Sequence, residues 1–459
     1  MRYSKVELRC RVKGVLQLRN EYEGLTSYAG LELIRQYFSR LSLVEQIRRH
    51  VGGYLPRSDY GSVPMLLLVL TLIISGGRRV RHIGYLGSDP VVLRCCGLKR
   101  LPSGCTLGRW LGGFSREGLT RLSVLNEKLA LSVIRAAGLR RLTIDVDGSV
   151  VSTGQKVEGA RRGFNPRHRR VPSYYPITAY ESQTGQVLAV RNRPGNVHDG
   201  KASVDFLKAV MERLREELGP GQILEWRMDG AFFRGDVVDL IADERRMEYA
   251  IKVPFYPWLG LKDRVVARRR WQAVATGVEC FECRHRVKTW GRTLRMVIYR
   301  KRVFHPTAKN FQLDLFDPDD GYYEYSAVAT NKSVTGRTLW HFMNARGIHE
   351  KVYGELKGGF AFGCVPAQTL QANSAWQLLS VLAFNLTRGF QRSTTAPQRR
   401  TNRKRRSLWR FDSIHTLRYQ YLHRAGRVVR TGGRRILDVG TAPAVFDHFL
   451  SIQKRLSTA

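Results

Sequence analysis

The order of strand-like and helix-like segments between residues 140 and 253 constrains the fold more than any other feature of the sequence. Residues 140–149 alternate apolar and polar side chains with a period of two, which is typical of a strand with one apolar face. Further strands are predicted at 176–181, 187–193, 223–229 and 249–253, and helices at 202–218 and 234–246. Three antiparallel strands followed by right-handed crossovers to two more place the first strand at the centre of a sheet, beside the 223–229 strand.

Both of these neighbouring strands end in an aspartate. Asp147 ends the first strand just before Gly148 and shares a strand face with Asp145, while Asp229 ends the strand at 223–229. Because parallel neighbours end at the same edge of a sheet, Asp147 and Asp229 should emerge side by side. The alternative is a pair of ordinary solvated strand ends. This strand order is that of a ribonuclease-H-like core, so we expect an α/β fold of that kind.

A helix over residues 346–357 would carry charged and polar side chains along one stripe, namely Arg346, Glu350, Tyr353 and Lys357. No aliphatic residue lies on this stripe, so the helix should face something charged. Glu355 points to roughly the opposite side and is a poor substitute for Glu350. The alternative interpretation is an ordinary Arg–Glu pair on a solvated helix.

Three acids in this chain order suit the cleavage of phosphodiester bonds. That reaction needs an activated water or 3′-hydroxyl and a stabilised leaving oxygen, and two Mg²⁺ ions about 3.5–4 Å apart supply both. Mg²⁺ prefers carboxylate oxygens and keeps several waters, so few protein ligands are needed. Asp147, Asp229 and Glu350 supply a strand end, a second strand end and a helix, in that order.

The charge of the chain indicates a polyanionic partner. Lys and Arg number 77 against 38 Asp and Glu in 459 residues, a net charge of +39 at pH 7. Nucleic acid is the expected partner, with a ribosomal or membrane-surface role as the alternative. Glycoside hydrolysis by paired carboxylates would fit the acids but not this charge. A content of 43% hydrophobic residues is ample for packed cores.

The cysteines and apolar segments indicate a cytoplasmic protein without a membrane span. Seven cysteines at irregular spacing suit a reducing compartment, and Cys280, Cys283 and His285 form at most half a zinc site. The longest apolar run, at 63–75, is too short for a bilayer and predicts a buried helix. We expect no signal peptide in the first twenty residues, which could be a strand pair or an unstructured start.

We expect five segments: a mainly helical N-terminal DNA-binding domain (1–138), the first part of the core (139–255), a β-rich insertion (256–335), the second part of the core (336–392) and a basic C-terminal region (393–459). Single helices are expected over 31–51 and 107–125, and no helix within the insertion. In the first segment, Ser103 could cap a helix carrying Arg109, which resembles the second helix of a helix-turn-helix. A structural bundle helix is the alternative. The basic run at 388–406 predicts a linker or an arm on a phosphate backbone.

These stretches resemble bacterial insertion-sequence transposases of the DDE class, in the group with a β-rich insertion before the glutamate. That group has the helix signature Y-(2)-R-(3)-E-(6)-K, which Arg346, Glu350 and Lys357 match, whereas Met343 occupies the tyrosine position and Phe342 precedes it. The stretches at 103–111, 145–149, 193–198 and 227–232 also resemble family motifs, and the resemblance covers about residues 60–430.

The resemblance implies that Asp147, Asp229 and Glu350 hold two Mg²⁺ ions, for which Mn²⁺ can substitute, with Asp145 as the alternative to Asp147. Its implied DNA contacts are Arg346, Lys357, Arg109, Arg193 and an aromatic that stacks a flipped base, either Trp290 or Trp271, unless these pack internally.

The implied function is cut-and-paste transposition by a homodimer on terminal inverted repeats, in a bacterial cytoplasm and associated with the nucleoid. The partners would be the double-stranded DNA of the transposon ends and of the target. A ribonuclease-H-like nuclease or resolvase without strand transfer is one alternative. A non-catalytic DNA-binding repressor is the other.

Overall fold

The computed structural model describes residues 23–163, 170–197, 199–200, 203–303, 323–396 and 409–457. Its helices are α1 (Leu31–Arg40), α2 (Leu43–His50), α3 (Ser62–Ile74), α4 (Pro90–Cys96), α5 (Gly104–Gly112), α6 (Arg116–Arg135), α7 (Ser203–Leu218), α8 (Gly235–Ala242), α9 (Leu261–Val266), α10 (Gly336–Asn344), α11 (Gly347–Gly359), α12 (Leu370–Thr394), α13 (Ile414–Leu417) and α14 (Pro443–Ser457). Its strands are β1 (Leu25–Thr26), β2 (Arg141–Gly148), β3 (Val151–Ser152), β4 (Ser173–Tyr174), β5 (Ile177–Glu181), β6 (Gln186–Arg191), β7 (Ile223–Met228), β8 (Met247–Val253), β9 (Gln272–Ala275), β10 (Val278–Val287), β11 (Arg292–Arg302), β12 (Tyr323–Thr330), β13 (Gly426–Thr431) and β14 (Arg434–Val439).

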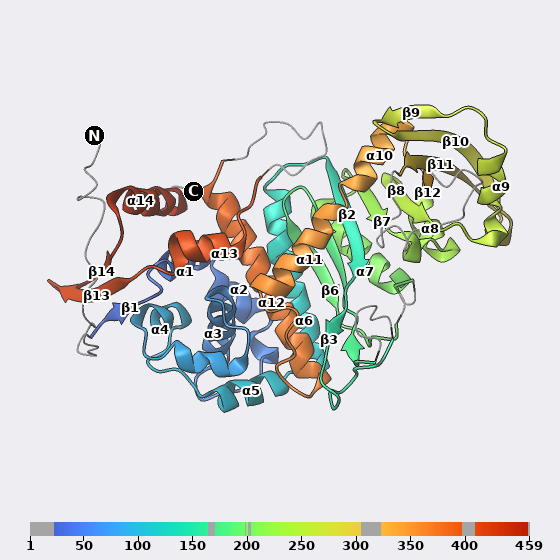
Figure 1. Cartoon of the computed structure of the whole chain (residues 1–459). Coiled ribbons are helices and arrows are strands. Elements are labelled where there is room, and N and C mark those ends of the chain that lie inside the picture. The colour runs from blue at the N-terminus through green and yellow to red at the C-terminus, as the bar shows by residue number, and fades with distance from the viewer. Residues whose placement is uncertain are drawn as a thin grey trace, which may run out of the picture.

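The largest sheet within the described residues has nine strands in the order β6-β5-β2-β7-β8-β12-β11-β10-β9. Strand β2 pairs antiparallel with β5 and parallel with β7, and β7 pairs parallel with β8. The predicted ribonuclease-H-like order is therefore confirmed, with β2 in the core and β7 beside it (Figure 1).

The β-rich insertion continues this sheet. Strand β12 pairs antiparallel with β8, with Ala327 opposite Val253 and Thr330 opposite Ala250. Strands β11, β10 and β9 follow outward from β12, so the core and the insertion share one hydrogen-bonded ladder (Figure 1). A short helix, α9, also lies in this segment, contrary to the expectation of none.

The two faces of β2 are both covered, which explains its composition. Its apolar side chains, Leu142, Ile144 and Val146, are buried in a cluster with residues of α6, α7 and α8. On its other face Thr143 and Asp145 are also buried, and each bonds to a side chain of the neighbouring strand β7, Glu225 and Arg227 respectively, because a buried polar group needs a partner. This buried polar face leads directly to the carboxylates at the strand ends.

The N-terminal helices pack around α12, which runs through the middle of the molecule (Figure 1). Helix α3 is apolar on all sides and buried from Met65 to Ile74, as the run at 63–75 predicts. The single helix expected over 31–51 breaks at Ser42, whose φ of 48° is left-handed, and the one expected over 107–125 breaks where Ser115 caps α6. One hydrophobic cluster joins α1–α6 to α12, so these helices are not a separately packed body.

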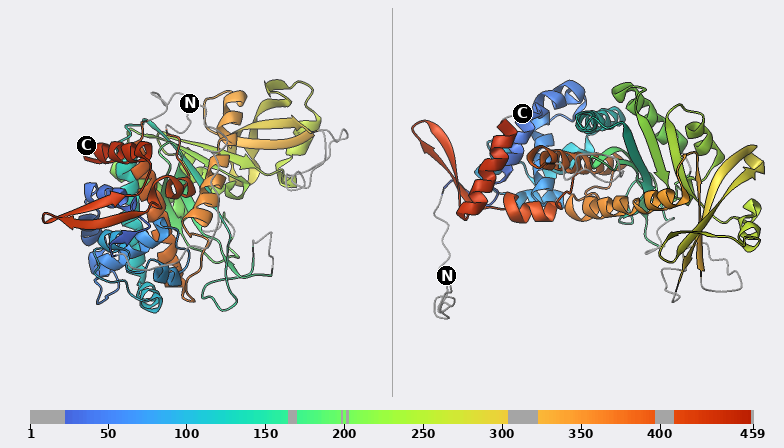
Figure 2. Two further views of the ribbon diagram at one scale, coloured as in Figure 1. Left: turned by 60° about the vertical axis from the view of Figure 1, so that its left-hand side comes forward. Right: turned by 90° about the horizontal axis from the view of Figure 1, so that it is seen from above.

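The described C-terminal region folds back onto the N-terminal helices. Strands β13 and β14 form a hairpin whose base pairs with β1, and α14 lies against α1 and α12 (Figure 2). Residues 1–22 and 397–408 lie outside the described residues, and so do the predictions for residues 1–20 and for much of the arm at 388–406. No helix of the described parts combines the length and hydropathy needed to span a membrane.

Candidate active site

Three acids from separate elements approach one edge of the sheet. Asp147 lies near the end of β2, and its Oδ1 accepts a hydrogen bond from the Gly148 amide at 3.0 Å. Asp229 follows β7, and its Oδ1 accepts from the Ala231 amide at 3.0 Å. Glu350 lies in the first turn of α11. The sequence-predicted order of strand end, strand end and helix thus brings these residues to one region.

A guanidinium group lies between two of these acids. Arg346 precedes the first residue of α11, and its Nη2 atom lies 2.8 Å from Asp147 Oδ2 and 3.7 Å from Asp229 Oδ2. Only 16% of the Arg346 side chain is exposed. Burial lowers its pKa, but the nearby acids, with Asp147 and Asp229 contributing most, raise that pKa above its ordinary value. Arg346 therefore stays protonated and occupies a cation position.

The surroundings of Asp147 disfavour its ionised form. Burial, together with the negative charges of Asp229 and Asp199, raises the pKa of Asp147 to about 7, although Arg346 opposes this shift. A carboxylate in such a position gains much from a nearby cation.

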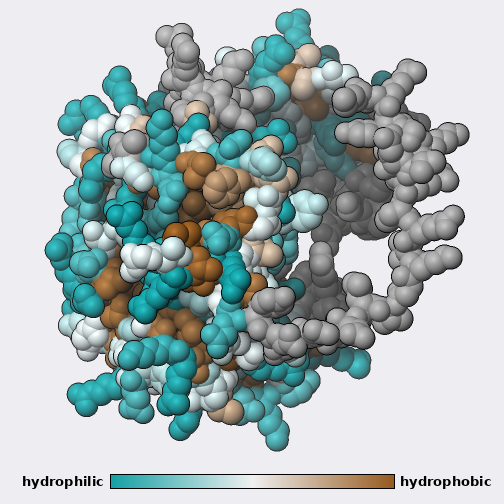
Figure 3. Space-filling model, turned by 90° about the vertical axis from the view of Figure 1, so that its left-hand side faces the viewer, coloured by the Kyte–Doolittle hydropathy of each residue, from teal (hydrophilic) through white to brown (hydrophobic). Residues whose placement is uncertain are grey.

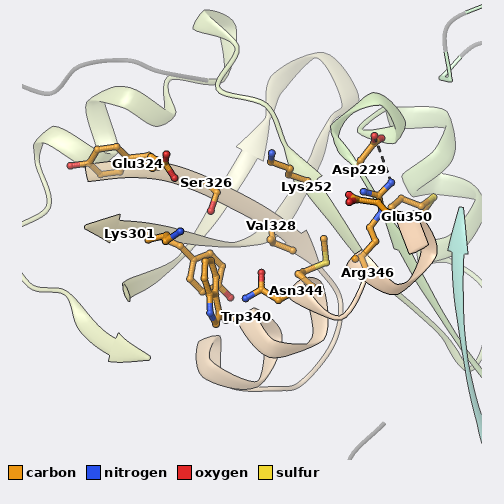
Figure 4. A pocket seen from close by; sticks show the side chains of 15 residues that line it. Asp229, Lys252, Lys301, Glu324, Ser326, Val328, Trp340, Asn344, Arg346 and Glu350 are labelled. Carbon is orange, nitrogen blue, oxygen red and sulfur yellow. Dashed lines mark ion pairs between the residues drawn. The ribbon is translucent and has the colours of Figure 1, made fainter. Parts of the chain in front are cut away.

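A cavity of about 390 Å³ opens beside Arg346, between the core and the insertion. Asp229, Arg346 and Glu350 lie close together at one end of this cavity (Figure 4). The remaining lining includes two cations, an aromatic ring and an amide: Lys252, Lys301, Trp340 and Asn344. Asp229 and Glu350 therefore border a space in which positive side chains are also available to an anionic substrate.

Asp145, the alternative to Asp147, is fully buried and paired. Arg227 donates from Nε to its Oδ1 at 2.5 Å and from Nη2 to its Oδ2 at 2.7 Å. Arg227 also donates from Nη1 to the Phe342 carbonyl of α10 at 2.6 Å. Because the Arg227 guanidinium takes both oxygens of Asp145, Asp147 is the one of the two aspartates that faces Arg346.

The polar stripe of α11 faces β2, which excludes the solvated-helix interpretation. The Tyr353 hydroxyl donates to the Asp147 carbonyl at 2.8 Å and accepts from Thr178 Oγ1 at 2.7 Å. Lys357 Nζ donates to Ser149 Oγ and to the Val150 carbonyl, both at 2.6 Å. These bonds fasten the helix that carries Glu350 to the end of β2.

His349, on the same helix, is a buried residue that the sequence argument missed. Its ring stacks between Tyr180 and Tyr353, at 5.4 and 5.0 Å between ring centroids. Burial, with the charges of Arg346 and Arg227, lowers its pKa to about 3, so the imidazole is neutral. The sequence around His349 gives no sign that its ring packs between two tyrosines.

Arg193 requires a correction. Its side chain is buried, and it donates from Nη2 to Asp199 Oδ1 at 2.7 Å and from Nε to the Tyr175 carbonyl at 3.0 Å. The Tyr175 hydroxyl donates to the other Asp199 oxygen at 2.7 Å. The guanidinium ties the Asp199 side chain to the Tyr175 carbonyl and is not placed to contact DNA. Asp199, missed in the sequence, thus lies behind Asp147.

The other predicted DNA contacts fall in different surroundings. Arg109 is exposed on α5, so its proposed role stays a prediction. Trp290 is half-buried against Phe233, with 4.7 Å between ring centroids, and the Trp271 ring packs 4.9 Å from that of Phe281. Both tryptophans therefore have the packing role that was the alternative, whereas Trp258, which the sequence argument missed, is 52% exposed.

The described residues complete no zinc site around Cys280, Cys283 and His285. Cys280 and Cys283 are an odd number of residues apart on β10, so their side chains point to opposite faces of the sheet. In the part of the chain that the structure describes, no three His, Cys, Asp or Glu side chains are grouped closely enough to hold a metal ion.

The strand order, with Asp147 and Asp229 at one edge of the sheet, defines a ribonuclease-H-like protein. The family model described as "Transposase DDE domain group 1" matches residues 12–459, and the chain belongs to this family of DNA transposases. No curated protein matches the sequence. A solved structure described as "Cryo-EM structure of piggyBac transposase synaptic complex with hairpin DNA (SNHP)" is similar over 87% of this chain and 81% of that chain, with 10% identity and a TM-score of 0.45.

Proposed function

We propose that this transposase binds the terminal inverted repeats of its element, cleaves the DNA ends and joins the freed 3′-hydroxyl groups to target DNA. The observation that carries the proposal is the cation position shared by Asp147 and Asp229, which Arg346 occupies beside a cavity that Glu350 also lines. A site built to hold positive charge between carboxylates suits metal-assisted phosphodiester chemistry.

Transposases with a DDE domain generally use divalent metal ions. The donors are carboxylate oxygens, which suit such ions, and the Arg346 guanidinium stands where a cation would lie. The three acids are not yet grouped closely enough to hold a metal ion, so binding would require them to draw together. We propose that Asp147, Asp229 and Glu350 hold two Mg²⁺ ions, with Mn²⁺ able to substitute, once the guanidinium withdraws. When bound, these ions would activate the attacking water and stabilise the leaving oxygen.

The remaining residues of the site bind and orient DNA. Withdrawn from Asp147, the Arg346 guanidinium would hold a phosphate next to the scissile bond through its planar fork of donors. Lys252 and Lys301 would meet the backbone of the strand that enters the cavity. Lys357 acts on the protein itself, because its ammonium group holds the loop after β2 through Ser149 and Val150.

We further propose a homodimer that pairs the two transposon ends in the bacterial cytoplasm. The test is cleavage of a labelled duplex carrying the element's own ends, with Mg²⁺, with Mn²⁺ and with EDTA. We expect metal-dependent nicking at the element boundary, followed by joining to a second DNA. Nicking without joining would indicate a nuclease or resolvase, and binding without nicking a repressor.

The matched variants for this assay are Asp229→Asn and Asp236→Asn. Both remove one carboxylate charge, but Asp236 is exposed and pairs with Arg234 at 2.7 Å, away from the cavity. Asp229→Asn should keep DNA binding and lose cleavage, whereas Asp236→Asn should retain both. Wild-type cleavage by Asp229→Asn would remove Asp229 from the proposed site.

A further inference from the structure

The β13–β14 hairpin projects from the body of the molecule with few contacts of its own. Its base pairs with the two residues of β1, through Leu25 opposite Arg427 and Thr26 opposite Gly426. Its tip is the pair Gly432 and Gly433, whose φ values of 56° and 74° form a two-residue turn. Figures 1 and 2 show the hairpin at the opposite end of the molecule from the insertion, with the candidate active site between them.

The exposed side chains of this hairpin concentrate positive charge. Four arginines are exposed along it, namely Arg427, Arg430, Arg434 and Arg435. The register places Arg430 directly opposite Arg435, and like charges in that relation destabilise a strand pair. None of the four forms an ion pair with a described residue, so the fold gains nothing visible from this arrangement. The cost is explained if a polyanion neutralises the hairpin.

The surface around the hairpin is mixed. Figure 3 shows this face of the molecule, where hydrophilic side chains surround a hydrophobic area. The partly exposed apolar residues of β14 and α14, which include Ile436, Phe446 and Leu450, line a cavity of about 330 Å³ on one side of the hairpin. Arg435 is itself one of the residues that line this cavity, so the charged ribbon and the apolar area adjoin.

We propose that the β13–β14 hairpin is a second contact with double-stranded DNA, away from the point of cleavage. A two-stranded ribbon fits the major groove, arginine binds both phosphate oxygens and guanine edges, and the side-chain-free tip allows close approach. The inference rests on the proposed function and deepens it, because it assigns the hairpin to DNA farther along the transposon end. Arg430 and Arg435 carry the contact.

The test compares the double variant Arg430→Ala/Arg435→Ala with the double variant Lys208→Ala/Arg245→Ala. Both remove two positive charges from exposed positions, the second pair on α7 and just after α8. Loss of two phosphate contacts makes the plot of log K against log[salt] shallower, with a slope about 1.8 smaller in magnitude. Between 50 and 200 mM salt, the affinity of the wild type for an end duplex should therefore fall about tenfold more than that of the hairpin variant.

Two further readouts separate binding from folding. Removing the like-charged pair should leave the melting temperature unchanged or raise it, whereas loss of a structural contact would lower it. Footprinting should show that the hairpin variant loses protection only in the DNA farther from the cleavage point. The matched Lys208/Arg245 variant should keep the wild-type footprint and salt slope.

The inference is overturned if the hairpin variant keeps the wild-type salt slope and footprint, or if the control variant loses as much affinity. It is also overturned if the variant loses binding to vesicles of anionic phospholipid and not to DNA. These outcomes are independent of catalysis. A wild-type protein that never cleaves DNA would refute the proposed function, even where the hairpin variant weakens DNA binding.

Discussion

The guanidinium of Arg346 takes the place between Asp147 and Asp229 that a shared cation would fill, 2.8 Å from one carboxylate and 3.7 Å from the other. The same residue directly precedes the helix that carries Glu350. The site therefore holds a positive charge of its own, and a metal ion bound as we propose would compete with Arg346 for the same two carboxylates. Once displaced, the guanidinium would be free to meet the DNA backbone, as we propose.

Arg346→Ala should bind Mn²⁺ more tightly and cleave DNA more slowly. Loss of the competing cation should raise the affinity for Mn²⁺ about tenfold, or about 1.4 kcal/mol, by isothermal titration. Loss of the phosphate contact should lower the cleavage rate by about 10²-fold or more. Arg346→Lys keeps the positive charge but lacks the planar guanidinium. Its Mn²⁺ affinity and its cleavage rate should therefore lie between those of the wild type and those of Arg346→Ala. Unchanged affinity and rate in Arg346→Ala would show that the guanidinium serves neither purpose.

Asp147 should make the metal-free protein less stable as the pH rises. Its folded pKa of about 7 lies above the unfolded value of 3.8, so the folded state binds more protons between these values. Stability is therefore lost as the pH rises from about 4 to about 7, by at most about 4 kcal/mol. In chemical unfolding with EDTA, Asp147→Asn should gain stability over the wild type at pH 8 and little at pH 4. An equal gain at both pH values would contradict the shift.

Asp145 and Arg227 should behave as a structural pair. Arg227→Met leaves the Asp145 carboxylate buried without its partner, which should cost about 3–5 kcal/mol in urea unfolding. The double variant Asp145→Leu/Arg227→Met should regain most of that loss. Arg234→Met is the control, because its pair with Asp236 is exposed and worth under about 1 kcal/mol. Loss of metal binding in Asp145→Asn without loss of stability would instead make Asp145 a ligand.

Gly148→Ala should damage the site through sterics alone. A Cβ atom at this position would lie 2.2 Å from Asp199 Oδ1 and 2.3 Å from Tyr175 Cε1, so either these two side chains or the end of β2 must shift. We expect a loss of about 1–3 kcal/mol and slower cleavage, because Asp147 moves with the strand. Gly108→Ala on α5 has open space and should stabilise slightly. Wild-type cleavage by Gly148→Ala would show that this close packing is not needed.

The sequence predicts the strand order and the three acids because their signals are local. The period-two alternation of β2 and the polar stripe of α11 are both visible within about ten residues, and each places its acid on a definite face. The burial of Arg193 and the nearness of Asp199 to Gly148 depend on contacts between different segments. No pattern of neighbours in the chain distinguishes a buried arginine in a turn from one that meets DNA.

The pairing of β12 with β8 is another contact between distant segments that a local sequence pattern cannot predict. Most of the insertion lies between these two strands in the chain, and their register depends on a loop closure that the local sequence pattern does not encode. The breaks at Ser42 and Ser115 were missed because apolar periodicity continues across each of them.

The continuous ladder from β8 into β12 also limits how such proteins can be recombined. A chimaera that exchanged residues 256–335 between relatives would have to preserve the register of Ala327 on Val253, since otherwise the new strand would present the wrong face. Deleting the insertion would leave β8 as a bare edge open to pairing with other chains. The insertion therefore cannot be exchanged independently of the core, and grafting it requires that β8 be redesigned with it.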